Sequence, residues 1–225
     1  IQKVLKMHEE NPGPREPSNF HPKEGEKVSR GSGFVIRIGE EEFLLTNAHV
    51  LNRAPKTLQE KGLIIDDDDI GIIPVKACDI KPGYKLAEIA NIKNEDLLKR
   101  EVYFSGLGSH FFEVRGHVHS VMEIQKLRRF PIMPTISSDG PRFLSNYYCV
   151  PLEENAISKV IGNTSGHFSG MSGSAVFDAE TGKVVGMFGT SAKTDLDGQD
   201  FHLAMLSGPE QLQRAVQKMK EKIGK

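Results

Sequence analysis

The chain has 225 residues and a formal net charge of −1 at pH 7, with 29 basic and 30 acidic side chains. This balance gives no electrostatic reason to expect a nucleic-acid partner or binding to an anionic membrane surface. Hydrophobic residues make up 38% of the sequence, which is enough for a sizeable core, and no apolar run is long enough to span a bilayer.

The beginning of the chain differs in pattern from the rest. Apolar residues at helical spacing in Ile1–His8 predict a short helical stretch, and the proline-rich segment 11–17 interrupts it. We therefore expect residues 1–27 to form an N-terminal extension and linker, with the folded domain over residues 28–225.

From Val28 onward, short apolar strands alternate with turn residues. One set of predicted strands, sufficient for a first barrel, lies at 33–38, 42–46, 62–65, 70–77, 84–92 and 101–106. A second set lies near 111–123, 146–151, 158–162, 174–177, 183–189 and 200–206. The capping-box spacing of Ser207–Glu210, followed by apolar residues at helical intervals, predicts a C-terminal helix over 207–223.

Two segments carry the residue types that acyl transfer requires. Ser172 lies in G170-M-S-G-S-A-V176, a glycine turn before a strand, where backbone N–H groups can converge on a substrate oxygen. His49 ends the apolar strand F43-L-L-T-N-A-H-V-L51. Because a free hydroxyl is a weak nucleophile until a base takes its proton, the two residues together predict an activated serine.

With the glycine-marked strand G31-S-G-F-V-I36, these segments give the chain a family resemblance. In their order and content they resemble the trypsin/chymotrypsin-like serine endopeptidases, in the bacterial or HtrA-type form, over residues 28–216. The resemblance implies an all-β fold of two antiparallel six-stranded barrels, about 28–110 and 111–206, with the terminal helix packed on the second. It also implies polypeptide substrates and no cofactor or metal, and we expect a secreted or periplasmic location rather than a cytoplasmic one.

The same resemblance implies a role for each matched residue. Ser172 attacks the scissile carbonyl, and His49 acts first as general base and then as general acid. The N–H groups of Gly170 and Ser172 form the oxyanion hole. Met171 occupies the position where zymogen-activated proteases carry an aspartate that pairs with a new N-terminus, so packing or a ligand must order this turn.

The third catalytic residue is where the sequence departs from the family. In the family this residue is the aspartate of a D-[IL]-A-[LIV]-[LIV] strand, about 30 to 40 residues after the histidine. The segment Y84-K-L-A-E-I-A90 matches that strand in a register that places Lys85 at the aspartate position. A lysine cannot accept the imidazole N–H and opposes formation of the imidazolium. Asp79 and Glu88 are the alternative carboxylates.

The specificity pocket of the family is built just before the nucleophile and along the strand that begins at Val184. The matching positions are His167, Phe188 and Gly189, which we take as candidate substrate-binding residues. Family glutamyl endopeptidases hold an acidic side chain with a histidine in this pocket. His167, with His202, gives this chain a weak case for acidic or polar selectivity, because Phe188 replaces their strand histidine.

Other polar clusters predict less. The four carboxylates Asp66–Asp69 lack the glycine and glutamate spacing of an EF-hand, so we interpret them as a solvated hairpin turn. His117 and His119, with His110 nearby, have no convergent carboxylate or cysteine to complete a metal site. Cys78 and Cys149 cannot define a disulfide framework and are expected to be buried apolar residues in different barrels.

Two functions therefore remain open from the sequence. One is a serine endopeptidase acting through His49 and Ser172, with activity impaired by Lys85. The other is a non-catalytic protease homologue that binds a peptide in its cleft by strand addition without cutting it. In the second case Lys85 is either the natural residue or an introduced substitution. The natural residue at position 85 discriminates between the two functions, because an aspartate there would identify the lysine as introduced.

Overall fold

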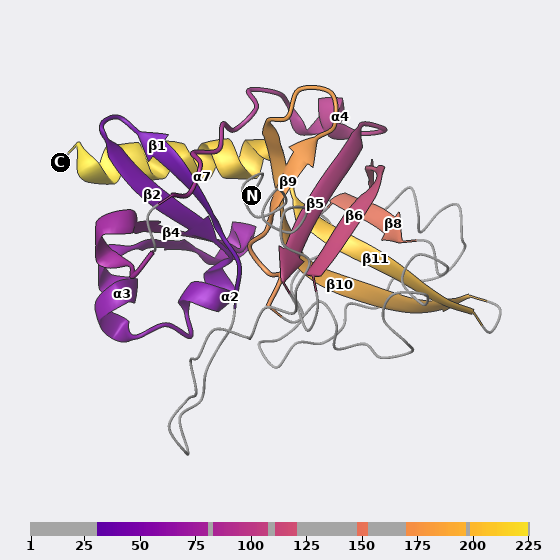
Figure 1. Ribbon diagram of the computed structural model, residues 1–225, viewed down its shortest axis with the longest axis horizontal. Coiled ribbons are helices and arrows are strands. Elements are labelled where there is room, and N and C mark those ends of the chain that lie inside the picture. Colours follow the sequence, from indigo (N-terminus) through magenta and orange to yellow (C-terminus); the bar gives the residue numbers. More distant parts are fainter. Residues whose placement is uncertain are drawn as a thin grey trace, which may run out of the picture.

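The computed structural model describes residues 31–80, 83–107, 111–120, 148–152, 170–196 and 199–224. The expected N-terminal extension, the predicted strand at 158–162, His110 and His167 lie outside these residues. The rest forms two antiparallel sheets and a long C-terminal helix (Figure 1). The predicted all-β class with a terminal helix is confirmed.

The first sheet has four strands in the order β1-β2-β4-β3. Their bounds are Phe34–Ile38 for β1, Glu41–Thr46 for β2, Ile70–Pro74 for β4 and Leu63–Ile65 for β3. Between β2 and β3 lie the short helices α2 (Ala48–Leu51) and α3 (Lys56–Lys61). The 3₁₀ turns η1 (Asp66–Asp68) and η2 (Val75–Ala77) lie before and after β4.

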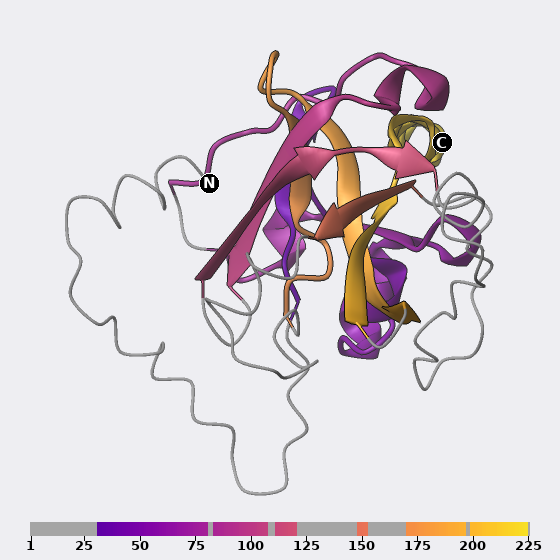
Figure 2. The same cartoon turned by 90° about the vertical axis from the view of Figure 1, so that its right-hand side faces the viewer.

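The second sheet has seven strands in the order β6-β5-β9-β10-β11-β8-β7. Their bounds, in chain order, are Glu101–Leu107, Phe111–His117, His119–Ser120, Tyr148–Leu152, Ala175–Asp178, Val184–Leu196 and Gln199–Ser207. The two outer strands, β6 and β7, are separated in the chain only by Val118, so the sheet curls into a nearly closed barrel (Figure 2). A Cβ added at Gly116 of β6 would lie only 2.7 Å from Val150 of β8, which agrees with this closure.

The strand counts differ from the six and six that the sequence predicted. Within the described residues the sheets have four and seven strands, and β5 belongs to the second sheet rather than the first. The predicted strand at 84–92 is a linking segment that pairs only at two isolated bridges, Val35 with Leu86 and Ile89 with Val184. Because this segment passes from one sheet to the other, it bridges β1 of the first sheet and the start of β10 in the second and joins neither ladder.

The C-terminal helix α7 (Pro209–Ile223) joins the two sheets through a shared core. It begins with Pro209 in its first turn, where the missing N–H costs nothing. One face buries Leu212, Ala215 and Met219 against residues of β1, β2 and β4, and the same cluster includes Val184 and Met187 of β10. A second cluster fills the seven-stranded sheet. The shared core therefore fixes the positions of the two sheets relative to each other.

A buried carboxylate on β9 stabilises the barrel. Asp178 is 2% exposed, and it accepts hydrogen bonds from the Arg100 guanidinium at 2.5 Å and from the N–H groups of Glu180 at 2.8 Å and Thr181 at 3.3 Å. Burial alone would raise the pKa of Asp178, but the Glu180 N–H and Arg100 outweigh it and hold the pKa below its usual value. The folded state thus favours the ionised form.

Asp178→Ala should lower the free energy of unfolding at pH 7 by about 2 kcal/mol, the usual contribution of hydrogen bonds to a charged group. Because the folded pKa lies below the unfolded value, this stabilisation is present above about pH 4 and is lost as the pH falls through the folded pKa. Urea unfolding at pH 7 and pH 3, followed by circular dichroism, measures the difference. Asp79→Ala, at an exposed aspartate, is the control, and equal losses in the two variants would contradict the prediction.

Candidate active site

The pairing of β2 with β4 places His49 beside Asp69. Thr46, the last residue of β2, pairs with Gly71 near the start of β4. His49 follows β2 in the short helix α2, and Asp69 immediately precedes β4. Since the two strands are antiparallel neighbours, the end of one and the beginning of the other lie at the same edge of the sheet.

Asp69 forms a close pair with His49. Its carboxylate oxygens lie 2.9 and 3.1 Å from His49 Nδ1, and Oδ1 also accepts the backbone N–H of His49 at 3.0 Å. Asp69 is 4% exposed, so solvent screens this pair little. An ionised carboxylate only accepts hydrogen bonds, so Nδ1 carries the imidazole proton and Nε2 keeps a lone pair that can take a proton.

The backbone of Asp69 is fixed as firmly as its side chain. Its φ of +52° is in the left-handed region, which aspartate tolerates better than most residues. The Asp69 carbonyl accepts hydrogen bonds from the N–H of Ala48 at 3.1 Å and from the amide of Asn47 at 3.0 Å. These bonds hold the residue against the first turn of α2.

The structure therefore places Asp69, not Lys85, against His49 Nδ1. Asp69 and the first residues of β4, D69-I-G-I-I73, differ from the D-[IL]-A-[LIV]-[LIV] pattern only by glycine in place of alanine, and Asp69 lies only 20 residues after His49. The interpretation of Asp66–Asp69 as a fully solvated turn was wrong for Asp69. Of the alternative carboxylates, Asp79 is exposed and Glu88 accepts a hydrogen bond from Lys183 at 2.5 Å.

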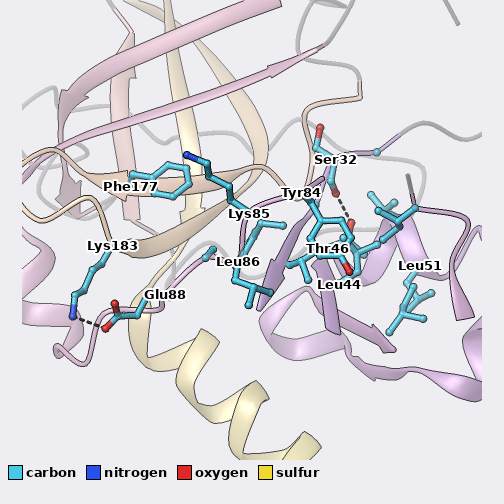
Figure 3. Close-up of a pocket in the computed structure, with 18 of the residues that line it drawn as sticks. Ser32, Leu44, Thr46, Leu51, Tyr84, Lys85, Leu86, Glu88, Phe177 and Lys183 are labelled. Carbon is cyan, nitrogen blue, oxygen red and sulfur yellow. Dashed lines mark hydrogen bonds and ion pairs between the residues drawn. The ribbon is translucent and has the colours of Figure 1, made fainter. Parts of the chain in front are cut away.

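Lys85 lies on the linking segment instead. It lines a pocket of about 680 Å³ whose walls come from the first sheet, the linking segment and the outer face of β5 and β9. Figure 3 shows the Lys85 side chain extending toward the Phe177 side of this pocket, away from Thr46 and Leu51. Neither His49 nor Ser172 is among the described residues that line it.

The turn that carries Ser172 is held from both sheets. From the first sheet, Ser32 donates its hydroxyl to the Gly170 carbonyl at 2.7 Å and its N–H to the Ser172 carbonyl at 2.8 Å. From the second, Met171 is fully buried in the barrel core, and the Gly173 N–H donates to the Phe188 carbonyl at 2.8 Å. The apolar packing of Met171 supplies the ordering that the sequence required at this position.

Two N–H groups of this turn have no acceptor among the described residues. Within the described part of the chain, neither the Gly170 nor the Ser172 N–H donates a hydrogen bond. Gly170 has a φ of +95° and Gly173 a φ of +96°, values that glycine adopts without the penalty other residues pay. A Cβ at Gly173 would lie 2.1 Å from the Ser32 carbonyl, so only glycine fits there.

Gly189 connects Ser172 to the His49–Asp69 pair. The Ser172 hydroxyl donates to the Gly189 carbonyl at 2.9 Å. A Cβ at Gly189 would lie 3.8 Å from a carboxylate oxygen of Asp69 and 3.9 Å from the amide nitrogen of Asn47. Gly189 of β10 therefore lies between the Ser172 hydroxyl of the second sheet and the Asp69 carboxylate at the edge of the first.

The candidate specificity residues are only partly described. Phe188 is 1% exposed and stacks on Phe104 with ring centroids 5.3 Å apart, so its side chain belongs to the core and not to a substrate pocket. Its backbone instead supports the Ser172 turn, because its N–H donates to the Ser174 carbonyl. His167 lies outside the described residues, and His202 of β11 is placed only by its backbone pairing with Leu152 of β8 and Lys193 of β10.

The described residues contain no group of three or more histidine, cysteine or acidic side chains that could hold a metal. Neither cysteine forms a disulfide; Cys149 is buried in β8, whereas Cys78 is partly exposed, which corrects the expectation that both are buried. Desolvation raises the pKa of the Cys78 thiol. Among the helices described, none has the length and apolar character that crossing a membrane requires.

Comparison with known proteins identifies a family for the chain. The sequence model of a family described as Trypsin-like peptidase domain matches residues 31–187. Among solved structures, a kallikrein-related peptidase 10 complex with Zn²⁺ is similar with a TM-score of 0.47 and 13% identity, covering 86% of this chain and 98% of that one. A catalytically inactive tobacco etch virus protease complexed with substrate is similar with a TM-score of 0.36 and 12% identity, covering 83% and 82%. No curated protein sequence matches the chain.

Proposed function

The chain belongs to the family of trypsin-like peptidase domains, and we propose that it is a serine endopeptidase whose catalytic residues are Ser172, His49 and Asp69. The observation that carries the proposal is the buried Asp69 carboxylate 2.9 Å from His49 Nδ1, next to the strand whose Gly189 carbonyl holds the Ser172 hydroxyl. Asp69 takes the role of the third catalytic residue, the position at which the sequence register had placed Lys85.

In the proposed mechanism the Ser172 hydroxyl turns from Gly189 to His49. His49 Nε2 takes the hydroxyl proton as Ser172 Oγ bonds to the carbonyl carbon of the scissile peptide. The ionised Asp69 stabilises the imidazolium, and the unused N–H groups of Gly170 and Ser172 stabilise the oxyanion. His49 then donates the proton to the leaving amine, the C–N bond breaks, and water repeats the sequence to release the acyl group.

The non-catalytic alternative loses its main support. It depended on a lysine beside His49, where a positive charge would oppose the imidazolium. Lys85 lines a different pocket, and a carboxylate contacts His49 in its place. Polypeptides remain the proposed substrate class.

A fluorophosphonate probe tests the proposal, because it reacts only with an activated serine. We expect covalent labelling of the native chain at Ser172, located by mass spectrometry of the digested protein, and no labelling after heat denaturation. Cleavage of a mixed peptide library should accompany it. Peptide binding without labelling or cleavage would instead support the non-catalytic homologue.

A further inference from the structure

The residue before Asp69 is held from the C-terminal end of the chain. The Asp68 carboxylate accepts two hydrogen bonds from Arg214 of α7, at 2.7 Å from Nη2 and 3.2 Å from Nε. The Asp68 carbonyl accepts the Ser207 hydroxyl at 3.1 Å. The Asp68 side chain is only 12% exposed, so these contacts fix both the side chain and the backbone of the residue.

Asp69 needs such a restraint. Its left-handed backbone costs roughly 1 kcal/mol or more relative to an extended or helical one. It also ends a run of four carboxylates, whose mutual repulsion favours a more open turn. Rotation of the peptide between Asp68 and Asp69 would swing the Asp69 carboxylate away from His49.

Arginine suits this restraint better than another cation would. Its planar guanidinium binds a carboxylate through two parallel hydrogen bonds and so fixes orientation as well as charge. A lysine at the same place would supply a point charge with no fixed direction.

We propose that Arg214 is a positioning residue for the catalytic carboxylate: by holding Asp68, it keeps Asp69 directed at His49 Nδ1. This inference rests on the proposed function for its effect on turnover, but the geometry it predicts does not depend on activity. Arg214 touches no reacting atom in this scheme and acts through the turn that carries Asp69.

A purely structural role is the competing explanation, since exposed ion pairs commonly contribute 0 to about 1 kcal/mol to stability and nothing else. The chain contains a matched control. Arg37 donates to Glu42 at 2.8 Å across β1 and β2, and its side chain is 56% exposed, against 53% for Arg214. Arg37→Gln therefore removes a comparable ion pair away from the Asp69 turn.

The test measures hydrolysis of a fluorogenic peptide library by variants of the full chain. The single variants are Arg214→Gln, Arg214→Lys, Asp68→Asn and the control Arg37→Gln. A double variant combines Arg214→Gln with Asp68→Asn. We expect Arg214→Gln and Asp68→Asn each to lower kcat about tenfold with KM within about twofold, since small misplacement of a catalytic group is costly. The double variant should lose no more than either single one, because both act on one contact. Arg214→Lys should recover only part of kcat, and Arg37→Gln should match the parent.

Proton NMR supplies a readout that needs no activity. The proton that His49 Nδ1 shares with Asp69 should give a far-downfield resonance, which Arg214→Gln should shift or broaden and Arg37→Gln should preserve. An unchanged resonance and kcat in folded Arg214→Gln or Asp68→Asn would overturn the positioning role, even in an active enzyme. An altered resonance in a chain that cleaves nothing would support the positioning role and refute the proposed function.

Discussion

Ser172→Ala should lower kcat for peptide hydrolysis by about 10⁶, the loss found when the nucleophile of a related triad is removed. The remaining groups still bind and polarise the substrate, so a small residual rate from the oxyanion donors should persist. The measurement compares initial rates on a fluorogenic peptide library for parent and variant at equal folded concentration, with circular dichroism as the check on folding.

Ser174→Ala is the matched control for this experiment. The Ser174 hydroxyl is buried next to this turn and has no hydrogen-bond partner in the part of the chain that the structure describes, so its removal should leave turnover within about twofold. If Ser172→Ala kept more than about 1% of the parent rate, a different nucleophile would be required.

Asp69→Asn should lower kcat by about 10⁴, as the same substitution does in a related triad. An amide can donate as well as accept, so it no longer dictates that Nδ1 carries the proton, and it cannot stabilise the imidazolium as an anion does. Steady-state rates at pH 7 on the same library measure the loss. Asp67→Asn, at an exposed carboxylate in the same acidic run, should change kcat by less than about twofold.

Lys85→Asp separates the two assignments of the carboxylate. With Asp69 beside His49, a new carboxylate on the linking segment should leave kcat unchanged within about twofold. A gain of about 10² from Lys85→Asp, together with a normal rate for Asp69→Asn, would show that the register placing Lys85 at the catalytic position was right after all.

The sequence predicted those parts of the site that short motifs define. His49 and Ser172 are marked by residues next to them in the chain, and most strands were placed within a few residues because their alternation reflects burial on one face of a sheet. The need for packing beneath Ser172 was also visible, because Met171 cannot form an ion pair.

Asp69 was missed although its motif is present. D69-I-G-I-I73 has the expected pattern, with glycine where the family carries alanine, but it follows His49 sooner than the family spacing and stands in a run of acidic residues typical of solvated turns. Burial of one member of that run is a tertiary effect, produced by the pairing of β2 with β4. Ser32 was not predicted as a support of the Ser172 turn, because its hydrogen bond to Gly170 is also a tertiary contact. The neighbouring Gly33 did indicate crowding, since a Cβ there would lie 2.6 Å from the Leu45 carbonyl.

The linking segment at 84–92 has the sequence pattern of a strand but belongs to neither sheet. Its alternating apolar residues fit a strand, but the alternation arises because the segment lies against two different sheets in turn. Periodicity reports which side of a segment is covered and does not report whether a neighbouring strand continues beside it. The register that placed Lys85 at the aspartate position depended on that predicted strand.

The short connection between His49 and Asp69 also affects when the site is completed during synthesis. These two residues lie at adjoining ends of neighbouring strands in a locally connected sheet, so they can meet soon after their part of the chain leaves the ribosome. The Ser172 turn, β10 and α7 follow much later in the chain. A chain synthesised only through the first sheet would thus carry the proposed base without the proposed nucleophile, and hydrolysis would require the segments that follow.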